Sequence, residues 1–69
     1  MTKKVYIEGM TCNHCAKHVE DALKEIDGVQ SVKVDLKGKF AVIESAKPIE
    51  DASIKATIED AGYEPVKIE

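Results

Sequence analysis

The order in which strand-like and helix-like segments alternate constrains the fold of this chain more than any other feature. Residues 4–8 alternate polar and apolar side chains, which is typical of a half-buried strand, and the pattern turns Val5 and Ile7 inward. Residues 32–36 and 40–42 alternate in the same way across a short turn, which predicts a hairpin. Residues 63–68 follow a glycine and can form a last strand.

Two intervening segments repeat apolar residues at helical spacing. The first places them on a single helical face; its members are Cys15, Val19, Ala22, Leu23 and Ile26. The second follows Pro48, which suits a helix entry, and its apolar face consists of Ile54, Ile58 and Ala61. The sequence thus predicts the order strand, helix, strand, strand, helix, strand.

Polar and special residues predict where these elements end. Thr11 or Asn13 can cap the first helix, and the sequence does not decide between them. Gly28 and Gly62 close the first and second helices, because glycine adopts the left-handed conformation freely. Pro65 removes an amide donor from the last strand, so this strand is expected at a sheet edge.

This element order predicts an α+β fold, the ferredoxin-like βαββαβ sandwich, for residues 1–69 as a single domain. Its four-stranded antiparallel sheet carries both helices on one face. A faint internal similarity between residues 28–34 and 62–68 fits two related halves. A chain this short buries only about 60% of its unfolded surface, so we expect a small aliphatic core and modest stability.

Composition excludes several classes of protein. Two cysteines two residues apart cannot form a disulfide framework. The net charge of -3 comes from interleaved lysines and acids, and no basic patch indicates nucleic-acid binding. No apolar run approaches the ~20 residues of a membrane span, and no signal-peptide core precedes the first strand. We therefore expect a cytoplasmic location, where the thiols stay reduced.

Those two thiols, Cys12 and Cys15, are expected just before and at the start of the first helix. The free amides and partial positive charge of a helix N-terminus lower a thiol pKa, and Lys17 adds a positive charge nearby. Two thiolates alone suit Cu(I) and leave Zn(II) two ligands short of its preferred four. The low coordination also leaves room for a third thiolate from another protein, which favours transport over storage.

Each residue around the cysteines has two interpretations, a structural one and a metal-binding one. Met10 either packs in the core, which we favour, or supplies a thioether ligand. His14 is expected to point to solvent, where its charge can tune the site, and His18 is expected on the helix surface. The metal-binding alternative is a Zn(II) site in which both histidines and both cysteines are ligands.

At this point the chain resembles the heavy-metal-associated (HMA) domains, in particular the bacterial copper chaperones of the CopZ type. The motif Gly-Met-Thr-Cys-x-x-Cys is met at residues 9–15, and Asp27-Gly28-Val29 and Ala61-Gly62-Tyr63 match two further family segments. The resemblance implies that Cys12 and Cys15 ligate copper.

The same resemblance implies roles for the residues around the ligands. It makes Met10 a packing anchor beneath the loop and places Tyr63 beside the site, where a tyrosine favours a bacterial type. Thr11, His14 and Lys17 are the other expected neighbours of the ligands.

The function implied is that of a metallochaperone, not an enzyme. It would bind one Cu(I), with Ag(I) as a chemical equivalent, and deliver it to a copper-transporting P-type ATPase or a copper sensor. The chain is expected to be a monomer that copper can bridge into a dimer.

One alternative is an excised metal-binding domain of such an ATPase, although the initiator Met1 and an end at the last strand favour a free protein. The other is a thiol-disulfide oxidoreductase, against which the short chain and the strand order argue.

Overall fold

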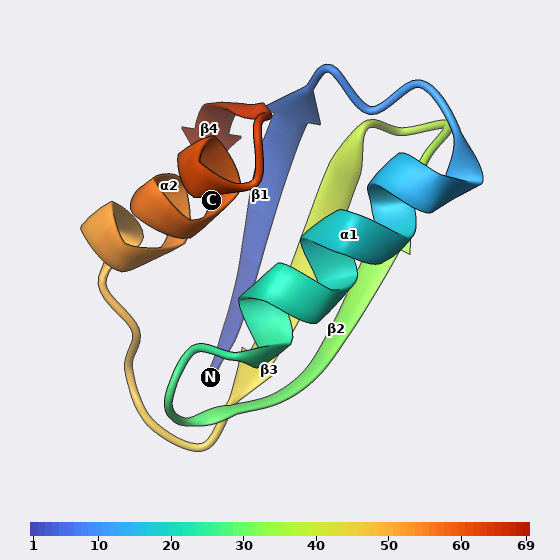
Figure 1. The fold of residues 1–69 in the computed structure, drawn as a ribbon. Coiled ribbons are helices and arrows are strands. Elements are labelled where there is room, and N and C mark those ends of the chain that lie inside the picture. The colour runs from blue at the N-terminus through green and yellow to red at the C-terminus, as the bar shows by residue number, and fades with distance from the viewer.

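The computed structural model describes all residues, 1–69, and has the predicted order of elements (Figure 1). The six elements are β1 (Thr2–Glu8), α1 (Asn13–Lys24), β2 (Val29–Asp35), β3 (Phe40–Ser45), α2 (Asp51–Asp60) and β4 (Glu64–Ile68). No helix has the length and apolar character that crossing a membrane requires.

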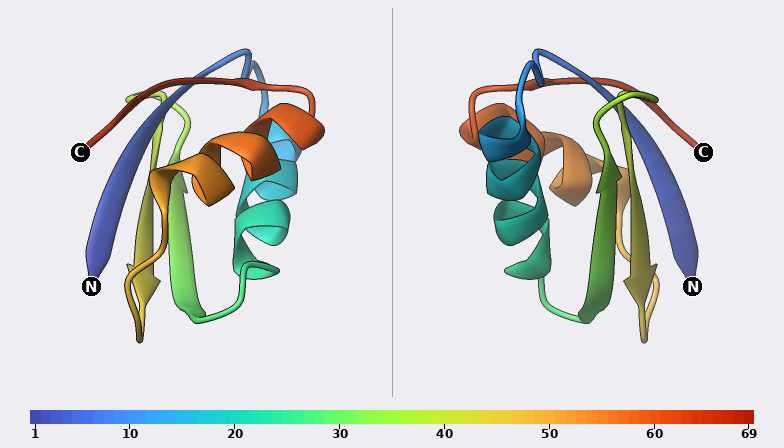
Figure 2. Two further views of the ribbon diagram at one scale, coloured as in Figure 1. Left: turned by 90° about the vertical axis from the view of Figure 1, so that its left-hand side faces the viewer. Right: turned by 90° about the vertical axis from the view of Figure 1, so that its right-hand side faces the viewer.

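The four strands form one antiparallel sheet in the order β2-β3-β1-β4. Both helices lie on the same face of this sheet, as the two side views show (Figure 2). The ferredoxin-like prediction is therefore confirmed. The expected edge position of the proline strand is confirmed too, because β4 pairs only with β1 and carries Pro65.

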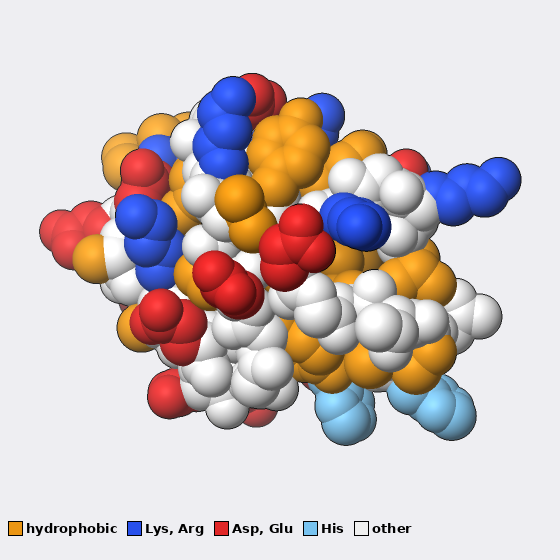
Figure 3. All heavy atoms as spheres, turned by 90° about the horizontal axis from the view of Figure 1, so that it is seen from above, with side chains coloured by type: hydrophobic (Ala, Val, Ile, Leu, Met, Phe, Trp, Pro, Cys, Tyr) orange, Lys and Arg blue, Asp and Glu red, His pale blue; other side chains and the backbone are white.

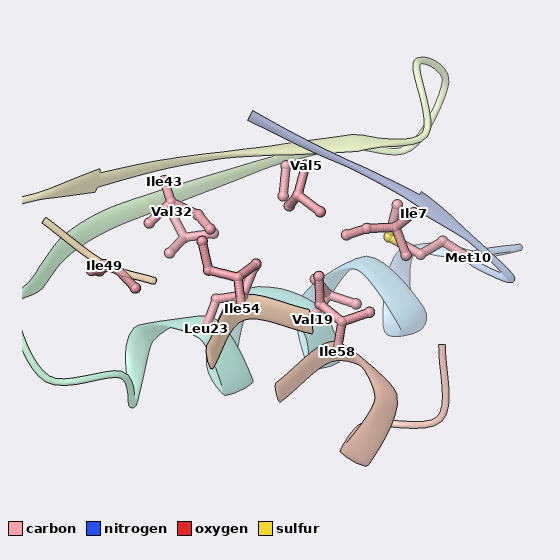
Figure 4. Close-up of a cluster of buried hydrophobic side chains, with 11 residues drawn as sticks. Val5, Ile7, Met10, Val19, Leu23, Val32, Ile43, Ile49, Ile54 and Ile58 are labelled. Atoms are coloured by element: carbon pink, nitrogen blue, oxygen red, sulfur yellow. The ribbon is translucent and has the colours of Figure 1, made fainter. Parts of the chain in front are cut away.

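The core fills the space between the sheet and the two helices (Figure 4). Its eleven buried residues are Val5, Ile7, Met10, Val19, Leu23, Val32, Ala41, Ile43, Ile49, Ile54 and Ile58. Nearly all are aliphatic, as the scarcity of aromatics in the sequence predicts. Val5 and Ile7 point inward as expected.

The third strand buries a different set of residues from the one that its apolar alternation suggests. Tyr6 pairs with Phe40, and Val5 with Ala41. Because directly paired residues lie on the same face of a sheet, Phe40 joins Tyr6 on the open face and Ala41 joins Val5 in the core. The two aromatic rings meet edge to face, with centroids 5.9 Å apart.

The first helix starts and stops differently from the sequence prediction. Cys12 is the N-cap residue and its side chain makes no capping hydrogen bond, so the expectation of a cap by Thr11 or Asn13 is wrong. The helix ends at Lys24, and a turn leads from there to Gly28, which has the left-handed φ of +95°. The extended backbone of Cys12 thus takes the cap position and turns its thiol outward at the start of the helix.

Candidate metal centre

The two cysteines meet in the loop between β1 and α1. Gly9 turns the chain out of β1 with a φ of +98°, and α1 begins four residues later. Cys12 lies in extended backbone at the N-cap, and Cys15 is the third residue of the helix. Their Sγ atoms are 3.5 Å apart, which is a non-bonded contact, since a disulfide bond measures about 2.05 Å. Both thiols are free, with Cys12 exposed and Cys15 half-buried.

Met10 anchors this loop from below. It is only 6% exposed and belongs to the core cluster, where it lies near Ile7 (Figure 4). A flexible thioether fills such an irregular space between a strand and a helix well. The position of Met10 therefore agrees with a packing role. Its hydrophobic contacts hold the cysteine loop between β1 and α1 in place.

Tyr63 lies beside the thiols although it is about fifty residues away in the sequence. Its hydroxyl is the main cause that lowers the pKa of Cys15 from 9.0 to about 6. Hydrogen bonding from the backbone at Thr11 and from the Cys12 thiol adds to this effect. In turn, the neighbouring Cys15 thiolate raises the pKa of the Tyr63 hydroxyl, which keeps that group protonated as a donor.

The lowered pKa of Cys15 was expected, but its causes differ in part from those expected. Lys17 is not among them; it pairs with Asp21 at 3.5 Å along the helix. Sequence reasoning missed the contribution of the Thr11 backbone, because no pattern of residue types shows where an amide points. Gly9 was also missed as a site residue: the Tyr63 ring lies against it, and a Cβ atom there would be in ordinary contact with Cδ1 at 3.5 Å, so the φ of +98° and not a lack of space favours glycine.

The histidines do not join the thiols. His14 and His18 are both exposed, and the chain contains no group of three or more His, Cys, Asp or Glu side chains that could hold a metal ion. The structure therefore does not bring together the four ligands of the Zn(II) alternative. On the end of the molecule seen from above, basic and acidic side chains lie on the same face (Figure 3). Along α1, Glu20 and Lys24 form an ion pair at 2.9 Å, as residues four apart on a helix can.

The resulting site offers two sulfur ligands, one of them largely ionised at neutral pH, and no third protein ligand. It is open to solvent on the Cys12 side. Such a site can hold a soft ion of low coordination number, and it leaves that ion accessible to another protein.

Comparison with known proteins agrees with this chemistry. The model of the heavy-metal-associated domain family matches residues 4–64. A copper chaperone CopZ of Bacillus subtilis is 42% identical over 66 residues, which cover 94% of this chain and 96% of that protein. A copper chaperone CopZ of Enterococcus hirae is 36% identical over 69 residues, and the match covers 94% of that protein.

Solved structures of similar proteins have the same fold. A structure of the CopZ metallochaperone superposes with a TM-score of 0.89 at 36% identity, covering 96% of this chain and all of that one. A copper binding domain from HMA7, a P-type ATPase, gives a TM-score of 0.87 at 36% identity over 100% of this chain and 99% of its own.

Proposed function

The chain belongs to the heavy-metal-associated domain family, and from this premise we propose that it is a copper metallochaperone. It binds one Cu(I) ion through the thiolates of Cys12 and Cys15 and passes the ion to a partner by thiolate exchange. It acts in the cytoplasm and catalyses no reaction. Ag(I) has the same soft chemistry and is expected to occupy the same site.

The observation that carries the proposal is the contact between the two free thiols, 3.5 Å apart on an exposed loop with no third ligand. Two thiolates satisfy Cu(I), whereas Zn(II) in structural sites takes four ligands. The full-length similarity to proteins named copper chaperones supports the choice of metal.

Transfer follows from the same geometry. A thiolate of the partner can bond to the copper from the exposed side before either of the protein's own copper–sulfur bonds breaks. Cys15 is half-buried beside Tyr63, whereas Cys12 is exposed, so we propose that on delivery Cys12 releases the ion first and Cys15 last. No step changes the charge on copper, and each new copper–sulfur bond replaces an old one.

The partner proposed is a copper-transporting P-type ATPase or a copper-responsive regulator that presents thiolates of its own. Similar domains occur in P-type ATPases, among them the copper binding domain from HMA7. A free chaperone is preferred to an ATPase domain, because the relatives at 42% and 36% identity are named copper chaperones.

The test is a competition titration of the reduced protein against a chromogenic Cu(I) chelator. We expect one ion per chain with sub-nanomolar or tighter affinity, abolished by Cys12→Ser or by Cys15→Ser. A parallel titration with Zn(II) should show much weaker binding. The proposal fails if Cu(I) binding survives the loss of either thiol, or if the reduced protein prefers Zn(II).

One further measurement separates this function from disulfide exchange with the same pair of thiols. A thiol-disulfide oxidoreductase would reduce a model disulfide substrate catalytically and would have no high affinity for Cu(I). We expect no catalytic turnover from this protein, with thioredoxin as the positive control in the same assay.

A further inference from the structure

The helix that carries Cys15 also carries both histidines of the chain. His14 and His18 are four residues apart in α1, so their Cβ atoms lie about 5–6 Å from each other on one helical face. Both side chains are exposed, and the space-filling view shows the two imidazoles as separate projections from the same edge of the molecule (Figure 3).

Neither imidazole is engaged elsewhere. No side-chain hydrogen bond or ion pair of the molecule involves a histidine. Lys17 lies between them in the sequence, and Asp21 pairs with its ammonium group at 3.5 Å. This pair partly offsets the positive charge that would otherwise repel a cation.

We propose that His14 and His18 form a second metal site, which binds one divalent ion of the borderline class, such as Ni(II), Zn(II) or Cu(II). Imidazole nitrogen suits these ions, and neighbouring turns of a helix can direct two imidazoles at one ion. This site is independent of the thiolate pair, which binds a soft monovalent ion.

The affinity of the histidine pair is expected to be modest. No third His, Cys, Asp or Glu completes the site, so water fills the other coordination positions of the ion. What the pair adds over a single surface histidine is chelation, because the second imidazole binds at an effective concentration of about millimolar or more. Loss of either histidine should therefore weaken binding at least tenfold.

The test uses Ni(II), which does not oxidise thiols, and a full-length variant with Cys12→Ser and Cys15→Ser to remove the thiolate site. Calorimetry gives the affinity and stoichiometry, and NMR reports which imidazole signals the paramagnetic ion broadens. We expect one Ni(II) per chain, broadening of both histidine signals, and at least a tenfold loss of affinity with His14→Gln or with His18→Gln.

A matched control keeps the number of histidines and changes their spacing. In a variant with His18→Gln and Asp21→His, the two histidines are seven residues apart, or about 10 Å along the helix axis. Because Asp21 pairs with Lys17, the reference is the variant with His18→Gln and Asp21→Asn, which lacks the same carboxylate, and the two variants should bind Ni(II) equally weakly. The inference is overturned if the relocated pair binds as tightly as the original one, or if either single substitution leaves the affinity unchanged in a folded protein.

Discussion

The ring of Tyr63 packs over Gly9 at the start of the cysteine loop, so that a Cβ atom at position 9 would lie 3.5 Å from Cδ1 of the tyrosine. This contact joins the segment before β4 to the segment after β1. It also places the tyrosine hydroxyl where it lowers the pKa of Cys15 to about 6. Tyr63, which lies between α2 and β4, therefore affects the ionisation of Cys15 at the start of α1.

The first prediction follows from this contact. Tyr63→Phe keeps the ring and removes the hydroxyl, so the pKa of Cys15 should rise from about 6 toward 9.0. Less thiolate is then present at pH 7, and alkylation of Cys15 by iodoacetamide should slow several-fold, because the thiolate is the nucleophile. The rate is measured against pH with Cys12→Ser in both proteins, so that only one thiol reacts. Because the Cys12 thiol also lowers the pKa of Cys15, the two proteins are compared with each other and not with the value of about 6. Identical pH profiles would show that the hydroxyl has no such role.

The second prediction concerns the stability of the metal-free, reduced protein. The folded state holds Cys15 as thiolate above pH about 6, whereas an unfolded thiol keeps its proton until about 9.0. Between these values the unfolded state binds more protons, so the free energy of unfolding should rise with pH, and this contribution is lost below pH 6.

The control for this pH dependence is Cys15→Ser, which should have a flatter stability profile between pH 6 and 9 in urea unfolding. Other shifted groups titrate outside this window: the pKa of Asp27 is lowered from 3.8 by Lys47, and that of Lys4 is raised from 10.5 by Tyr6. Equal slopes for the two proteins would contradict the prediction.

Sequence patterns predicted the element order and most of the core because both depend on side-chain periodicity. They gave the wrong cap for α1, because the N-cap depends on backbone geometry and Cys12 occupies it without a side-chain hydrogen bond. They also did not show that Phe40 faces outward. Its face is set by pairing with Tyr6, a contact between residues far apart in the sequence.

The candidate site was predictable to a similar extent. The spacing of Cys12 and Cys15 predicted that the thiols could converge, and the structure places them in contact. The position of Tyr63 came from a family resemblance, because residue types alone do not indicate which distant side chain covers a loop. Lys17 was expected near the thiols but pairs with Asp21, an interaction that the (i, i+4) spacing allows equally well.

The third prediction separates packing from ligation at Met10, which is 6% exposed. Met10→Leu nearly conserves volume and should cost less than about 1.5 kcal/mol of stability, while leaving Cu(I) affinity unchanged. Met10→Ala leaves a cavity and should cost about 2–5 kcal/mol. Urea unfolding and chelator competition measure the two properties. A large loss of Cu(I) affinity in Met10→Leu would instead identify the thioether as a ligand.

The fourth prediction is a copper-bridged dimer. The exposed thiol pair leaves the bound ion open to thiolates of a second chain, so one Cu(I) shared between two chains should shift the protein toward a dimer. Size-exclusion chromatography with light scattering compares the metal-free and Cu(I)-treated proteins. The Cys12→Ser variant should remain monomeric under both conditions. A wild-type protein that stays monomeric with Cu(I) at high concentration would count against bridging.

The fifth prediction concerns the hairpin between β2 and β3. Lys39 has a φ of +59°, which makes it the only residue other than glycine in the left-handed region. Lys39→Gly relieves the steric cost of this conformation at the expense of extra unfolded-state entropy, and the net gain should be a few tenths to about 1 kcal/mol. The lost ion pair to Glu8 is exposed, with a separation of 3.9 Å, and matters little. Lys37→Gly in the same turn is the control and should lower the melting temperature, because residue 37 has no positive φ to relieve.

A lower melting temperature for Lys39→Gly would contradict the prediction. It would show that the steric cost of the left-handed backbone at Lys39 is smaller than the entropy that glycine adds to the unfolded state.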